Sequence, residues 1–164
     1  MVSDITKAEV QLDFMHWLVH KGYLFFLDEV QTAATVQKYT VTTGATPLHY
    51  RVSIASGAKV GITILKDVTI TVAGTALTPK RYNNAVTTPT LLSVFQKGAT
   101  YTGGTSFKVN QSGFGSTPGQ AQSGSIGQDI EYIIPANASW AIEIDPSVST
   151  DIVSVSTFYE LALS

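Results

Sequence analysis

Most of the sequence consists of short runs of β-branched and aromatic residues separated by turn-forming residues. Successive side chains of a strand point to opposite faces of its sheet, so strict alternation is typical of a half-buried strand. Residues 49–55 show this alternation, with Tyr50, Val52 and Ile54 on one face. About eight to ten such runs, joined by connections of unequal length, predict an all-β fold: a two-sheet antiparallel sandwich of the jelly-roll type.

Turn signals divide these runs into individual predicted strands. Ser56 and Gly57 form a tight turn between two of them and predict a β-hairpin. Residues 78–88 contain strand breakers and predict a polar connection instead. At most one short strand is expected around residues 107–109. The other predicted strands cover residues 23–30, 37–42, 49–55, 59–65, 68–72, 90–96, 130–134, 140–144 and 152–159.

Residues 5–20 are the only stretch with a helical period. Apolar side chains recur there at steps of three and four, at Val10, Phe14, Trp17 and Leu18. The chain therefore divides into an N-terminal arm or helix over residues 1–21 and a single β-sandwich domain over residues 22–164. The aromatic arm either closes the bottom of the sandwich or clasps a neighbouring subunit.

Glycine, serine and glutamine concentrate between residues 101 and 128. This composition predicts a long loop without regular structure. Such loops in compact domains are usually binding loops or segments that a partner orders, the alternative being an idle surface loop.

Charge and cysteine content narrow the classes of function. The formal net charge is -2, and only 13% of residues are charged. Nucleic-acid binding usually requires a basic patch, so we expect no nucleic-acid partner. Without cysteines the chain has no disulfide scaffold and no thiolate nucleophile or metal ligand. No run reaches the roughly 18 apolar residues of a membrane helix, and no secretory signal opens the chain; we expect no membrane partner.

The three histidines are the first candidates for a chemical role. His16 and His20, four residues apart, would share a helix face and could hold one divalent metal ion. Trp17 stands where a zinc-protease motif has its glutamate, so a structural role for both histidines is favoured. His49 lies inside a predicted strand, which favours a hydrogen-bonded or exposed structural role. The expectation is no metal and no cofactor.

Catalytic serine and carboxylate arrangements are equally poorly supported. No G-x-S-x-G nucleophile elbow occurs. The acids Asp28, Glu29, Glu143 and Asp145 could approach one another in a fold, but their spacing neither proves nor rejects a glycosidase. We read them as solvated acids at strand ends and expect a protein that is not an enzyme.

Three sequence motifs carry a family resemblance. They are MHWLVHKGYLFF near the N-terminus, VTITVAGTALTPKRYNNA in the centre, and the closing Phe158-Tyr159-Glu160. Together they resemble tailed-bacteriophage capsid decoration proteins, also called head auxiliary proteins. The resemblance implies a non-catalytic virion structural protein, made in the host cytoplasm, which binds and stabilises the capsid exterior as a homotrimer. Its partners would be the major capsid protein and itself.

The alternative is a carbohydrate- or receptor-binding module of a phage tail or fibre. A glycan binder should expose Trp or Tyr on a concave face, whereas Trp17 and Trp140 stand in patterns that predict burial. The candidate partner-contact residues are Phe14, His16, Trp17, His20, Arg81, Asn83, Asn84 and Phe114.

Overall fold

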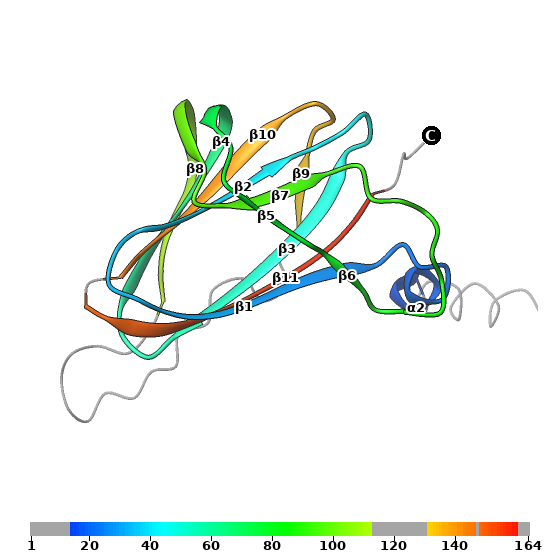
Figure 1. The fold of residues 1–164 in the computed structure, drawn as a ribbon, viewed down its shortest axis with the longest axis horizontal. Coiled ribbons are helices and arrows are strands. Elements are labelled where there is room, and N and C mark those ends of the chain that lie inside the picture. Colours follow the sequence, from blue (N-terminus) through cyan, green and yellow to red (C-terminus); the bar gives the residue numbers. More distant parts are fainter. Residues whose placement is uncertain (1–13, 113–130, 147, 161–164) are drawn as a thin grey trace, which may run out of the picture.

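Two antiparallel sheets pack face to face in the computed structural model, which describes residues 14–112, 131–146 and 148–160 (Figure 1). The five-stranded sheet has, in spatial order, β6 (Lys80–Arg81), β1 (Phe25–Ala33), β11 (Thr150–Glu160), β3 (Leu48–Ser56) and β9 (Tyr132–Ile134). The six-stranded sheet has β5 (Thr75–Leu77), β7 (Val94–Lys97), β2 (Gln37–Thr42), β10 (Ser139–Pro146), β4 (Val60–Val72) and β8 (Thr100–Ser112). The helix α2 (Phe14–His20) precedes them.

The strand pairing is nested along the chain. β1 pairs with β11, β2 with β10, β3 with β9, and β4 with β8. This is the pattern of a long antiparallel ribbon rolled into two facing sheets, as in a jelly roll. The short strands β5, β6 and β7 lie between β4 and β8 in sequence and extend the edges next to β1 and β2. The predicted β-sandwich with a short N-terminal helix is thus confirmed.

Alternating side chains of both sheets form the core between them. Phe158 is fully buried at its centre, with ring centroids 4.4 Å from Phe95 and 6.1 Å from Phe25. Ile54 and Ile144 bring buried aliphatic side chains from the two sheets into the same cluster. Because each such side chain stabilises the fold by about 1.5–3 kcal/mol on burial, the apolar face of each strand points into this core.

Part of the outer face of the six-stranded sheet is covered by strands of the same sheet. Thr40 and Ala141 occupy outward positions of β2 and β10, yet both are buried. Tyr101 of β8 donates a hydrogen bond to Glu143 of β10 at 2.5 Å, although β4 separates the two strands in the sheet. The paired β4 and β8 therefore curl back over this face (Figure 1). Register shifts in their pairing provide the bend.

Two predictions about connections are wrong. The turn at Ser56 and Gly57 makes no hairpin, because β3 belongs to one sheet and β4 to the other. Residues 59–65 and 68–72, predicted as two strands, form the single strand β4. Alternation locates a strand but does not identify its partner.

The prediction of a loop without regular structure over residues 101–128 is wrong as far as Ser112, because these residues belong to β8. Residues 102–107 are all exposed, so β8 has no apolar alternation for a sequence pattern to detect. Its pairing with β4 instead uses backbone hydrogen bonds at a sheet edge. The rest of the predicted loop, residues 113–128, lies outside the described residues, as do residues 5–13 of the predicted helix.

Candidate subunit-contact surface

Helix α2 packs against one end of the sandwich (Figure 1). Leu18 is fully buried there, in a small cluster with Leu24 and Tyr159 of β11. Gly22 ends the helix with a φ of 73°, a left-handed conformation that favours glycine. A Cβ at Gly22 would lie 2.7 Å from Val86 Cγ1, so the chain leaves the helix in close contact with a distant segment.

Three aromatic side chains form a stack on the outside of this end. The ring centroids of Phe14 and Trp17 are 6.2 Å apart and those of Trp17 and Tyr23 are 5.7 Å apart, with nearly parallel planes. Phe14 also contacts Tyr159 edge to face at 5.9 Å. Phe14 and Trp17 are each 43% exposed. The predicted burial of Trp17 is therefore wrong, and α2 presents apolar groups both to its own domain and to solvent.

His16 and His20 are both exposed on α2. Their Nε2 atoms lie 2.7 Å apart, and their ring centroids 4.3 Å apart. The predicted helical register thus places the two imidazoles side by side.

Arg81 has a structural role behind the aromatic stack. Its guanidinium donates hydrogen bonds to the carbonyl oxygens of Gly22 at 2.5 Å, Thr87 at 2.9 Å and Pro89. It also lies 4.6 Å from the centre of the Phe25 ring, a cation–π contact. One side chain therefore fixes the segment after β6 against the turn that follows α2.

Asn83 joins the same two segments. Its side-chain amide donates to the carbonyl oxygen of His20 at 3.2 Å, and its Oδ1 accepts from the Ala85 amide at 3.1 Å. Asn84 is exposed beside it. Phe114 lies outside the described residues. A hollow of about 460 Å³ separates the segments and is lined by His20, Lys21, Tyr23, Val86, Thr88 and Pro89.

The structure thus brings together predicted contact residues from two distant parts of the sequence. We call this surface the helical end: α2, residues 81–93 and the last residues of β11. Glu160 completes it, because its carboxylate accepts hydrogen bonds from the backbone amides of Leu92 and Ser93 at 2.9 and 2.7 Å.

A polar network that sequence reasoning missed supports the helical end from inside. Glu131 accepts hydrogen bonds from His49, from Arg51 Nη2 at 2.8 Å and from the Tyr159 hydroxyl at 3.0 Å. His49 stacks on the Tyr159 ring at 4.5 Å. Glu131 is 82 residues from His49 in sequence, and an isolated acid near a predicted strand start gives no signal of such pairing.

The contacts within this network shift the pKa values of Glu131 and Tyr159. Burial would raise the pKa of Glu131, but hydrogen bonds from His49, Arg51 and Tyr159 outweigh it and hold the pKa of this carboxyl below its usual value. Burial and the hydrogen bond to Glu131 raise the pKa of Tyr159 to about 12. Glu131 is therefore ionised at neutral pH and joins β3, β11 and the approach to β9.

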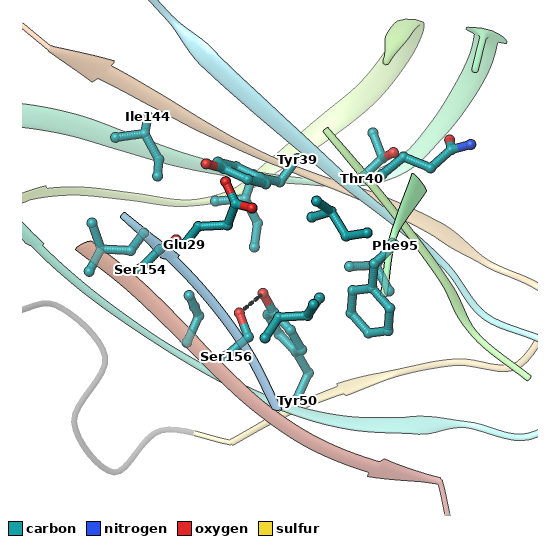
Figure 2. Close-up of a pocket in the computed structure, with 15 residues that line it drawn as sticks. Glu29, Tyr39, Thr40, Tyr50, Phe95, Ile144, Ser154 and Ser156 are labelled. Carbon is teal, nitrogen blue, oxygen red and sulfur yellow. Dashed lines mark hydrogen bonds between the residues drawn. The ribbon is translucent and has the colours of Figure 1, made fainter. Parts of the chain in front are cut away.

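A small cavity lies in the core between the two sheets. The cavity has a volume of about 30 Å³ and adjoins the hydrogen bond between Tyr50 and Ser156, whose hydroxyl oxygens are 2.7 Å apart. Figure 2 shows the side chains that line it. A cavity of this volume holds one or two water molecules. Glu29, which also borders it, forms an ion pair with Lys97 at 2.7 Å.

Of the other acids considered as a catalytic pair, Asp28 and Glu143 each have a separate partner, and Asp145 is exposed. Asp28 pairs with Lys80 at 3.0 Å, and Glu143 accepts a hydrogen bond from Tyr101. Within the described ranges, no three His, Cys, Asp or Glu side chains gather as a metal site. No helix among these residues is long and apolar enough to cross a membrane.

A second apolar area lies on the outer face of the five-stranded sheet. Val30 of β1 is opposite Val153 of β11 in register, and both are exposed, Val30 by 74%. Val155 adds a further exposed side chain on the same face.

Comparison with known proteins identifies no family. No protein-family model matches the chain, and no curated protein matches it. Among solved structures, the VP2 subviral particle of infectious bursal disease virus is matched at 10% identity with a TM-score of 0.13. The match covers 83% of this chain and 41% of that one. A TM-score this low carries no argument about fold or function.

Proposed function

We propose that the chain is a non-catalytic virion structural protein that binds the outside of a phage capsid and stabilises it as a homotrimer. The aromatic stack of Phe14, Trp17 and Tyr23 carries this proposal. Aromatic residues are enriched at the centres of protein interfaces, where they supply most of the binding energy. Two of these rings are 43% exposed and rest on a firmly packed helix.

The helical end is also preorganised, which supports its use as a contact surface. Arg81 and Asn83 fix the neighbouring segment through backbone carbonyls of Gly22 and His20. Glu131 secures Tyr159, against which Phe14 packs. A surface held in its bound shape loses little conformational entropy when a partner binds.

The proposed trimer stabilises the capsid by binding several of its subunits together. A trimer above a local threefold position of the capsid contacts several subunits at once, so individually weak contacts add through effective concentration. Binding to the assembled shell but not to its separated subunits stabilises the shell by mass action. This opposes the outward pressure of packaged DNA.

Co-sedimentation with capsids that lack the protein tests this function. The wild-type chain should pellet with the capsids, and Trp17→Glu should reduce its affinity by about tenfold or more. Val30→Glu is the matched control, since it places the same charge on the exposed valine of the sheet face. Wild-type protein that stays in the supernatant contradicts the proposal. An equal loss of affinity in both variants contradicts it as well, because the effect would then be independent of the helical end.

A carbohydrate-binding role is the second candidate, and a different observation favours it. A hollow of about 310 Å³ is lined by Phe107, Tyr132 and Trp140 together with Lys66, Asp67 and Glu131. Phe107 is 49% exposed, and its ring lies 5.2 Å from Trp140. Aromatic walls with a few polar groups are typical of small-molecule sites.

A glycan array discriminates between these two functions. Specific hits that Phe107→Ala abolishes would favour the carbohydrate reading. Binding to capsids with no hits on the array would favour the structural one.

A further inference from the structure

We propose that His16 and His20 bind one divalent transition-metal ion on the exposed surface of α2. The inference is independent of capsid binding. It rests on the convergence of two imidazole nitrogen atoms, the preferred nitrogen ligands of Zn²⁺, Ni²⁺ and Cu²⁺.

The geometry of the pair is close to that of a chelate. Residues four apart lie one above the other on a helix, and here the two Nε2 atoms point at each other across 2.7 Å. Two nitrogen ligands about 2.0–2.1 Å from a tetrahedral ion lie roughly 3.3 Å apart. Small side-chain rotations therefore open the pair enough for an ion to replace the proton between the two nitrogens.

The surroundings of the two imidazoles leave them accessible to an ion and favour positive charge. Both imidazoles are exposed, so an ion reaches them without unfolding. The carbonyl oxygens at a helix C-terminus carry partial negative charge, which favours positive charge in the last turn, where His20 lies. The Asn83 amide holds the His20 carbonyl at 3.2 Å and so restrains the backbone that carries this ligand.

The site supplies two ligands from the part of the chain that the structure describes, because no larger cluster of metal-binding side chains occurs there. The ion keeps open coordination positions for water or for a donor from a second molecule. Since both imidazoles bind together only when α2 is helical, the ion also stabilises the helix that presents Phe14 and Trp17.

Calorimetric titration of the untagged chain with NiCl₂ and with ZnCl₂ tests the proposal. One ion should bind per chain, and His16→Ala or His20→Ala should each weaken binding on the order of tenfold or more. The double change His20→Lys with Lys21→His is the matched control, because it keeps composition and charge but places the imidazoles five residues apart. Thermal unfolding without metal should be alike in all variants, since both side chains are exposed.

Quenching of indole fluorescence by CuCl₂ provides a second measurement. Trp17 adjoins His16, so bound Cu²⁺ should quench it in the wild type but not in His16→Ala, and a Trp17→Phe variant identifies its share of the signal. The absence of saturable binding would overturn the proposal. Equal binding by the wild type and the His20→Lys, Lys21→His chain would overturn it as well.

Discussion

Glu131 receives hydrogen bonds from three side chains at once, His49, Arg51 and Tyr159. Its carboxylate is mostly buried, so removing its charge leaves donors on two strands without their acceptor. Residues outside the helical end thus help to hold Tyr159, against which Phe14 packs.

Glu131→Gln should lower the free energy of unfolding by about 1–3 kcal/mol at neutral pH, because buried donors lose an ionised acceptor. The folded-state pKa of Glu131 is lowered, so its contribution is present above the unfolded value near 4.5 and is lost as pH falls through the folded value. Urea unfolding at a series of pH values should show the two proteins converging below about pH 4.5.

Asp28→Asn is the control for that experiment. Asp28 and Lys80 form an exposed ion pair, which contributes less than about 1 kcal/mol. A stability difference between wild type and Glu131→Gln that is independent of pH would contradict the account.

Substitutions at two neighbouring residues of α2 should destabilise the fold to different extents. Leu18→Ala should destabilise the fold by about 2–4 kcal/mol, since Leu18 is fully buried against Leu24 and Tyr159. Trp17→Ala should cost less than about 1 kcal/mol, because its ring is largely stacked at the surface. Chemical unfolding measures both. A larger loss for Trp17→Ala would mean that the ring serves the domain's own core.

At the scale of elements, the arrangement of the strands includes a close backbone contact at Gly74. Gly74 links β4 to β5 where these strands pass the link between β7 and β8. A Cβ at Gly74 would lie 2.3 Å from the Lys97 carbonyl oxygen and 2.6 Å from the Ala99 amide. Both are backbone atoms, so the curl of β4 and β8 over their own sheet requires glycine at this position.

Gly74→Ala should therefore destabilise the chain by about 2 kcal/mol or more, as overpacking against backbone does. Gly61→Ala within β4 is the control, because its Cβ would make ordinary contacts at 3.8 Å and beyond. Thermal unfolding of the two variants checks this. Equal melting temperatures would contradict the close approach.

The elements differ in how well sequence predicts them. Residues 37–42 are predicted to the residue, because apolar alternation and turn signals agree there. Of β8, only a short strand around residues 107–109 is predicted, because the exposed Thr, Ser and Gly residues before it leave no pattern of burial. The pairing of β3 with β11 joins residues about a hundred positions apart. Sequence does not predict it, because such a pairing depends on how all the strands pack in the core.

At the scale of the whole molecule, the nested strand pairing places the first and last described elements together. Phe14 contacts Tyr159, although they stand at opposite ends of the described chain. Aromatic content and family resemblance predict contact residues in α2 and in residues 81–84, but neither gives the distances between them. They lie close together because β6 pairs with β1, and because Arg81 and Asn83 then donate hydrogen bonds to the carbonyl oxygens of Gly22 and His20. The Glu131 network could not be foreseen, because it depends on that tertiary arrangement.

The proposed function requires this combined surface to face the capsid or a neighbouring copy. Cryo-electron microscopy of capsids incubated with the wild-type chain tests that requirement most directly. We expect symmetric added density into which the sandwich fits with its helical end at a subunit contact, and the loss of that density with Trp17→Glu. Capsids without added density, or density in which Phe14 and Trp17 face solvent, would contradict it.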